Sequence, residues 1–269
     1  MDQQEIEALV ARSRSSDPDH YAQVLDQLEA MIPELIELLQ SPDEVMRADC
    51  AYALGQVGEA ARDRIGPALL SLLADEENVV RNEAVLALHL QPYPPALESL
   101  KQVLYHDPDW VVRASAAEAL GNYQHEDLVS ALEQVLRNEE EEQEVRAYAA
   151  LSLGLVADPA FRPQLDAFIT GSISCLSLQS EILAASYRLG GQEHLSSLLD
   201  LLHTSDKNVV PLVLNAIQDL TERKYPPTLL TDAPYIRKAL NTLDQDVPLW
   251  HGHATQILDN LSKLEQADQ

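Results

Sequence analysis

Histidine, cysteine and carboxylate side chains are the groups in this sequence that could do chemistry, as metal ligands or as nucleophiles. His125 and Glu126 are adjacent, but the segment around them predicts a loop without a matching partner. His251 and His253 are two residues apart, a spacing that points two side chains of a helix in different directions. No glycine-rich phosphate loop follows a strand pattern, and no serine or cysteine lies in a nucleophile elbow. The sequence therefore predicts no catalytic residue, no metal site and no cofactor.

Two cysteines, Cys50 and Cys175, lie far apart in the sequence, and a disulfide between them is geometrically improbable in an elongated fold. Cys50 falls among small residues and is expected to be a packed core residue. The first sixteen residues lack the basic and apolar regions of a secretory signal, and the chain has no apolar run of about 18 residues. We therefore expect a cytoplasmic protein that does not enter a membrane.

An arginine recurs along the chain at a nearly constant interval. Arg47, Arg81, Arg113 and Arg146 are separated by 34, 32 and 33 residues, a period typical of repeat architectures. These guanidinium groups could form a ladder that binds ligands, or they could bridge neighbouring turns. Because acidic turns recur beside them, we favour charge-assisted hydrogen bonds that tie each repeat to the next.

Each repeat predicts a pair of helices. The first helix carries leucine and isoleucine at a spacing of three and four residues, as in IPELIELLQ at 32–40. An acidic turn follows, and its side chains can cap the next helix. The second helix contains small residues that let neighbouring backbones approach closely. Its four expected spans are 45–57, 79–90, 111–122 and 144–156.

The recurring motif, Asp-x-x-Val-Val-Arg-x-x-Ala-Ala-x-Ala-Leu-Gly, resembles the short bacterial HEAT repeat, in particular the phycobilisome-lyase-like (E/Z-type) subgroup. Beyond about residue 160 the likeness decays, since Gln179 and Pro211 replace the arginine while the apolar spacing persists. We expect an all-α fold, an α-α superhelix of about seven helical pairs. An N-terminal helical cap (1–31), well-formed repeats (32–160) and degenerate repeats with a C-terminal cap (161–269) would form one continuous solenoid.

Acidic residues dominate the charge of the chain. It has 44 Asp and Glu against 18 Lys and Arg, a formal net charge of -26, and residues 1–160 hold 31 of the acidic and 10 of the basic side chains. Such a field repels phosphate backbones, so nucleic acid is excluded as a partner. The acidity could maintain solubility, or it could attract a basic partner.

By resemblance to other HEAT solenoids, the second helices should line a concave face, with the variable positions between the alanines directed toward it. Tyrosines, leucines and carboxylates interleaved there suit a partner protein with a basic or apolar helical segment. The candidate partner-binding residues are Asp49, Tyr52, Gln56, Glu83, Leu86, Glu118, Asn122 and Tyr148, and Leu90, Ser115, Leu151 and Leu155 complete the rows. Trp110, expected in an inter-helix turn, is the candidate for an alternative contact at the edge.

Two functions stay open. The first is a non-catalytic scaffold or adaptor for protein–protein interaction, working as a monomer or in a hetero-complex. The second, implied by the subgroup resemblance, is a bilin lyase-type or chaperone-like subunit acting on a tetrapyrrole-binding light-harvesting protein. An enzymatic role would then be that of a lyase. Nothing in the sequence groups aromatic and histidine residues into a pigment pocket, so we favour the scaffold, because a repeat motif indicates fold more than function.

Overall fold

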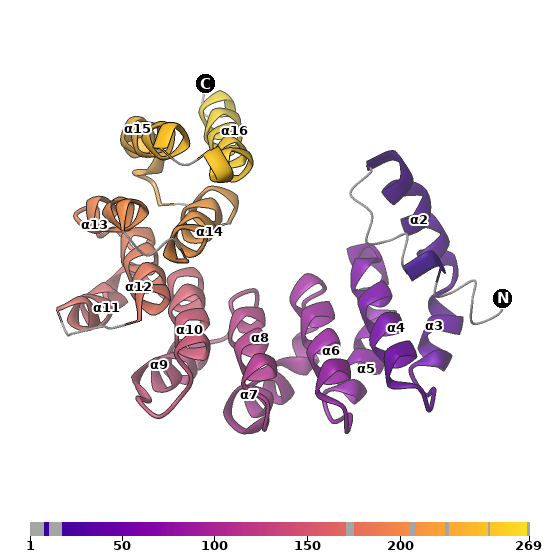
Figure 1. Ribbon diagram of the computed structural model, residues 1–269. Helices are drawn as coiled ribbons and strands as arrows, with labels where there is room; N and C mark the ends of the chain where they lie inside the picture. The colour runs from indigo at the N-terminus through magenta and orange to yellow at the C-terminus, as the bar shows by residue number, and fades with distance from the viewer. Residues whose placement is uncertain are drawn as a thin grey trace. The chain divides into compact units, whose positions relative to one another are not determined.

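The computed structural model describes residues 8–10, 18–170, 175–204, 208–223, 226–246 and 248–267. Within these residues the chain is helical and contains no strand, which confirms the all-α prediction (Figure 1). No helix in the same residues is long and apolar enough to cross a membrane. Residues 1–7 and 11–17 of the expected N-terminal cap lie outside the described part of the chain.

The described residues form α2 (Pro18–Ala30) and then seven helical pairs, the number expected from the repeats. The pairs are α3 (Ile32–Leu38) with α4 (Glu44–Gln56), α5 (Arg62–Leu72) with α6 (Asn78–Leu90), α7 (Leu97–His106) with α8 (Trp110–Leu120), α9 (Leu128–Arg137) with α10 (Gln143–Val156), α11 (Arg162–Ile169) with α12 (Leu176–Arg188), α13 (His194–Asp200) with α14 (Val209–Glu222), and α15 (Leu229–Asp246) with α16 (His251–Ala267). Short 3-10 turns are η1 (Glu59–Ala61), η2 (Pro94–Ala96), η3 (Pro159–Phe161), η4 (Leu201–His203) and η5 (Pro248–Trp250).

The helices α4, α6, α8 and α10 each begin one residue before the expected start, and an aspartate of the acidic turn caps α4 and α8. Asp43 Oδ1 accepts a hydrogen bond from the Val45 amide at 3.0 Å, and Asp109 Oδ1 accepts one from the Val111 amide at 2.8 Å. These bonds satisfy amides that have no partner inside the helix. Trp110 is therefore the first residue of α8, and the expectation that it lies in the turn is wrong.

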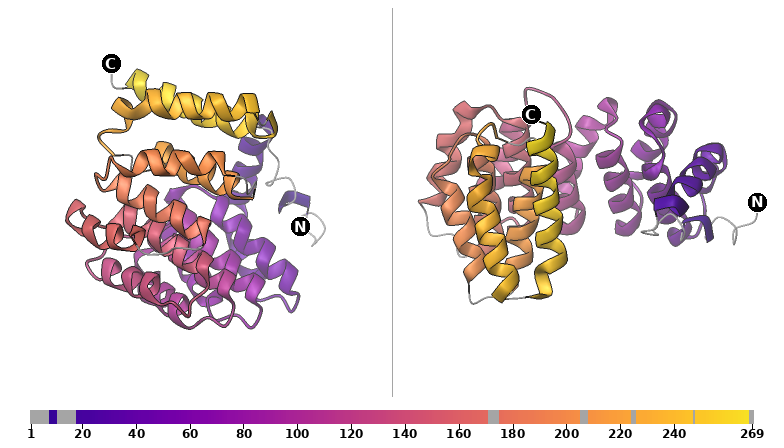
Figure 2. Two further views of the ribbon diagram at one scale, coloured as in Figure 1. Left: turned by 60° about the vertical axis from the view of Figure 1, so that its left-hand side comes forward. Right: turned by 90° about the horizontal axis from the view of Figure 1, so that it is seen from above.

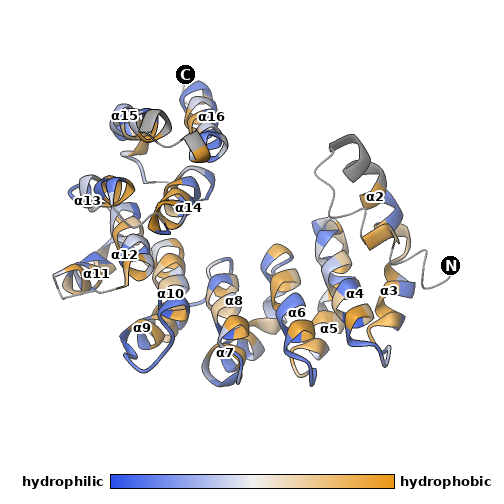
Figure 3. Cartoon of the chain, viewed as in Figure 1, coloured by the Kyte–Doolittle hydropathy of each residue, from blue (hydrophilic) through white to orange (hydrophobic). Residues whose placement is uncertain are grey.

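The small residues of α4, α6, α8 and α10 are buried where neighbouring helices pack. None of the eight expected alanines is more than 2% exposed: Ala51, Ala53, Ala84, Ala87, Ala116, Ala117, Ala149 and Ala150. The leucines that follow them in the motif, such as Leu54 and Leu88, are fully buried. Hydrophilic residues gather instead in the turns, as between α9 and α10 (Figure 3).

Two motif glycines permit an especially close approach between helices. A Cβ atom at Gly55 of α4 would lie 2.9 Å from the Cα of Ala87 on α6, and one at Gly154 of α10 would lie 2.9 Å from the Cα of Ala185 on α12. Real Cβ atoms do not approach backbone atoms this closely. At these two positions the packing of consecutive pairs therefore requires glycine.

Arg47 and Arg81 confirm the structural interpretation of the recurring arginine. Nε and Nη2 of Arg47 donate to the two carboxylate oxygens of Asp75 at 2.8 Å each, and Nη1 donates to the Ser41 carbonyl at 2.9 Å. Arg81 binds Asp107 in the same bidentate way, at 2.7 and 2.9 Å. Both arginines are buried. Each one fastens its own turn or helix to the turn of the following repeat.

The chain divides into two compact units, Met1–His125 with α2 to α8 and Glu126–Gln269 with α9 to α16. In the second unit an apolar cluster joins α12 to α16, and α16 packs against α14 and α15 (Figure 2). Arg188 Nη2 donates to Asp219 at 2.7 Å, so an arginine and an aspartate outside the motif take up the bridging role there. The division into 1–31, 32–160 and 161–269 stays a prediction.

Candidate partner-binding face

Four positions on α4, four on α6 and three on α8, with Asn122 just after α8, are at least partly exposed and recur at helical spacing, while most of the residues between them are buried. We call this set the variable face. It consists of Val45, Asp49, Tyr52 and Gln56 on α4, Val79, Glu83, Leu86 and Leu90 on α6, and Val111, Ser115 and Glu118 on α8 with Asn122 just beyond the end of that helix. Because the three helices are successive in the first unit, their exposed sides form one surface.

A hollow of about 290 Å³ lies on the variable face. Its lining includes five of the eight candidate residues, which the structure thus brings together: Tyr52, Gln56, Glu83, Leu86 and Glu118. Ala87, His89 and Leu90 complete the lining. Asp49 and Asn122 lie on the same face outside the hollow. Tyr148 is 38% exposed on α10 of the second unit, whereas Leu151, which the spacing placed on this face, is buried in α10.

His89 is the lining residue that reasoning from the sequence missed. It stands in the motif position that Gly55 and Gly154 occupy in α4 and α10, so Ala-Leu-Gly becomes Ala-Leu-His. The broken motif was the available signal. Asn122 donates to the His89 carbonyl at 3.0 Å, and its amide nitrogen lies 3.3 Å from His89 Nδ1. The imidazole therefore lies between the end of α6 and the residues that follow α8.

The hollow combines acidic and apolar groups. Glu83 and Glu118 contribute carboxylates from neighbouring helices, and Tyr52, Leu86 and Leu90 contribute aromatic and aliphatic surface. No lysine or arginine occurs among the residues that line it. An arginine or lysine side chain would satisfy both parts, because its aliphatic stem packs on apolar atoms while its charged head meets carboxylates.

One edge of the variable face is apolar. Val45, Val79 and Val111 are 60%, 45% and 41% exposed in the first turns of α4, α6 and α8, and Trp110 beside them is 43% exposed. We call these four residues the apolar edge. Asn78, in the first turn of α6, donates a hydrogen bond to Asp109, the capping residue of α8. This hydrogen bond is the main reason that the pKa of Asp109 lies below its ordinary value. The variable face thus runs from an apolar edge to an acidic hollow.

The other groups singled out for chemistry are not part of this face. Cys50 is fully buried and its Sγ lies 3.7 Å from Met46 Sδ, so it is a packed core residue, as expected. Burial raises the pKa of its thiol to about 12. His125 and Glu126 lie in an exposed loop, as predicted. His251 and His253 lie in the first turn of α16, where burial lowers the pKa of His253.

A family profile described as HEAT repeats matches the chain over residues 6–89, 32–121, 66–154 and 97–173. These overlapping ranges together span more than half of the 269 residues. No curated protein sequence matches the chain.

Several solved structures resemble this chain. The complex of CpcE and CpcF of phycocyanin lyase from Nostoc sp. PCC7120 is 20% identical with a TM-score of 0.62, covering 87% of this chain and 94% of that chain. Human deoxyhypusine hydroxylase is 20% identical with a TM-score of 0.39, covering 97% and 96%. An archaeal HEAT-like repeats protein from Thermococcus onnurineus NA1 is 16% identical with a TM-score of 0.37, covering 98% of each chain. At this level of identity, the likeness to the lyase structure shows the fold alone.

Proposed function

The chain belongs to the HEAT repeat family, and from this premise we propose that it is a non-catalytic scaffold or adaptor that holds a partner protein against its variable face. Repeat proteins of this kind bind partners through extended surfaces built from successive units. We place this role in the cytoplasm, with the chain either free as a monomer or bound to its partner in a hetero-complex.

The observation that carries the proposal is the hollow lined by Tyr52, Leu86, Glu83 and Glu118. Aromatic and aliphatic groups that surround a small number of polar groups are typical of the centre of a protein interface. The apolar edge continues the same surface over three helices. A helical segment of the partner that carries leucine-like residues on one side and lysine or arginine on its flank fits this arrangement.

Affinity capture from the native cell, followed by mass spectrometry, tests the proposal when three forms of the chain are compared. The wild type should enrich a partner that the double variant Glu83→Lys/Glu118→Lys fails to enrich. The control is Glu34→Lys/Glu37→Lys, which makes the same change of charge on exposed residues of α3 in the same unit. Equal capture by all three forms would contradict the assignment to the hollow. Loss of the partner with Trp110→Ala alone would move the contact to the apolar edge.

The bilin lyase-type role remains the second candidate, and so does membership of the phycobilisome-lyase-like (E/Z-type) subgroup. The resemblance of the chain to the phycocyanin lyase complex favours it. Mixing the purified protein with phycocyanobilin tests it directly, since a bound pigment changes its absorption spectrum. An unchanged spectrum would reject this candidate and leave the scaffold role untouched.

A further inference from the structure

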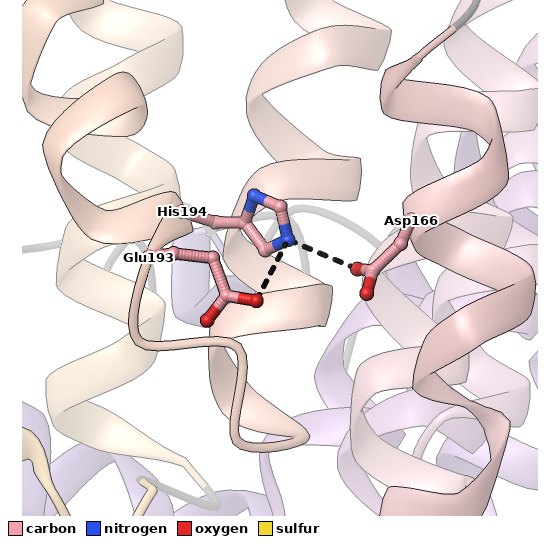
Figure 4. A group of neighbouring side chains, drawn as sticks. All are labelled: Asp166, Glu193 and His194. Atoms are coloured by element: carbon pink, nitrogen blue, oxygen red, sulfur yellow. Dashed lines mark hydrogen bonds and ion pairs between the residues drawn. The ribbon is translucent and has the colours of Figure 1, made fainter.

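Three metal-ligating side chains meet in the second unit (Figure 4). Asp166 lies on α11, and Glu193 and His194 lie at the start of α13. His194 Nε2 is 3.0 Å from Asp166 Oδ1 and 4.0 Å from Glu193 Oε1. The three ligand atoms all lie within 4.8 Å of one another.

These separations suit a first-row transition metal ion. With metal–ligand bonds of about 2.0–2.2 Å, adjacent ligand atoms of a tetrahedral zinc site are about 3.3 Å apart. The His194–Asp166 pair is already close to this distance. The Glu193 side chain is 59% exposed and can close the remaining gap by a small change of rotamer.

The surroundings fix the imidazole and the aspartate. The His194 side chain is 15% exposed, and Ser186 of α12 donates a hydrogen bond to Asp166 Oδ1. A Cβ atom at Gly191 would lie 2.7 Å from His194 Cδ2, so the absence of a side chain at Gly191 leaves the space that the ring fills. Outer partners of this kind orient metal ligands.

Arg162 would compete with a metal ion for the carboxylates of Asp166 and Glu193. Its Nε lies 3.4 Å from Asp166 Oδ2 and its Nη1 lies 3.8 Å from Glu193 Oε1, while Nη1 also donates to the Gly190 carbonyl at 3.1 Å. Both ion pairs are longer than the 2.8 Å contacts between Arg47 and Asp75. The Arg162 side chain is 34% exposed and can withdraw toward solvent when a dication arrives.

We propose that Asp166, Glu193 and His194 bind one divalent zinc-class ion, with water completing its coordination. One imidazole nitrogen and two carboxylates favour Zn²⁺ over Mg²⁺ or Ca²⁺, which prefer ligand sets made of oxygen alone. The bound ion links α11 to α13, which belong to consecutive pairs, and through Ser186 it also braces α12. The site is structural and does not depend on the partner-binding role.

Isothermal titration of the full chain with Zn²⁺, after dialysis against a chelator and in excess Mg²⁺, tests the proposal. The wild type should take up one ion. His194→Ala should weaken the affinity by more than about 100-fold, since loss of a ligand exceeds the 10–100-fold effect of an outer partner. His203→Ala, which removes an exposed histidine of η4 in the same unit, should leave the affinity unchanged.

Arg162→Gln separates a metal site from a simple network of ion pairs. If zinc and Arg162 compete, the variant binds Zn²⁺ more tightly, by about tenfold, because loss of one opposing charge near a carboxylate is worth roughly 1.4 kcal/mol. Glu193→Gln, a conservative change at an exposed position, provides the ligand test if His194→Ala does not fold. No uptake of zinc by the wild type, or equal uptake by wild type and ligand variants, would overturn the proposal.

Discussion

Arg47→Met tests how consecutive helical pairs are held together. Methionine keeps an unbranched stem but removes the guanidinium that donates to both carboxylate oxygens of Asp75 and to the Ser41 carbonyl. Removing one partner of a buried ion pair costs about 3–5 kcal/mol, because the other charge is left without compensation. The Arg47 and Asp75 side chains are 9% and 10% exposed, and this residual access to water places the expected loss of unfolding free energy near about 3 kcal/mol.

The loss should depend on pH. The hydrogen bond from Arg47 is the main reason that the pKa of Asp75 lies below its ordinary value of 3.8. A carboxyl group with a lowered pKa in the folded state stabilises that state above its unfolded pKa, and the contribution disappears as the pH falls through the folded pKa. The difference between wild type and Arg47→Met should therefore be complete at neutral pH and shrink below about pH 4.

Urea unfolding followed by far-UV circular dichroism, at neutral and acidic pH, measures the difference. Arg64→Met is the control, because Arg64 is an exposed arginine on α5 of the same unit, and a surface change of this kind stays within about 0.5 kcal/mol. Adding Asp75→Asn to Arg47→Met should restore part of the stability, since no buried carboxylate is then left unpaired. A loss under about 1 kcal/mol at neutral pH, or a loss that is the same at both pH values, would refute the reasoning.

Three further outcomes are expected. Gly55→Ala should destabilise the chain by about 1–3 kcal/mol in urea unfolding, because its Cβ meets the Ala87 backbone, whereas Gly58→Ala, with open space around it, should not; equal effects would contradict the packing argument. In surface plasmon resonance on the captured partner, Glu83→Lys/Glu118→Lys should mainly slow association and Tyr52→Ala should mainly speed dissociation; unchanged rates would exclude the hollow. A thiol reagent at pH 8 should modify half-buried Cys175 before buried Cys50, and two equally fast thiols in the native protein would show that Cys50 is accessible.

The helical pairs could be predicted from the sequence because their causes are local and repeated. The alanine spacing, the capping aspartates and the period near 33 residues each depend on neighbours within one unit, and they placed the starts of α4, α6, α8 and α10 to within one residue. The bridging role of Arg47 and Arg81 followed from the turn carboxylates beside them. The end of α8 was less accurate: it stops at Leu120, two residues before the expected end.

The hollow was predictable only in part. Helical spacing placed Tyr52, Glu83 and Glu118 on one side of their helices, but the depression among them depends on how three helices pack, which no single repeat encodes. His89 could not be predicted from the repeat, because it departs from the motif at a position where glycine is expected to be buried between helices. In the second unit, Asp166 meets His194 and Arg188 meets Asp219 at residues that do not recur from repeat to repeat, so these contacts leave no periodic signal in the sequence.

The replacement of the motif glycine by His89 has a mechanical consequence. At Gly55 the backbones of α4 and α6 approach so closely that even a methyl group would collide, and such a contact resists bending as a rigid joint does. An imidazole in the equivalent place keeps α6 and α8 from approaching each other in that way, and we expect the packing between them to yield more easily than that between α4 and α6. When a partner protein binds the variable face, the first displacement of the helices would then occur between α6 and α8. The first unit would adjust to a partner protein of imperfectly matching shape by a change of the packing between α6 and α8. In that movement α4 and α6 would move together as one rigid body.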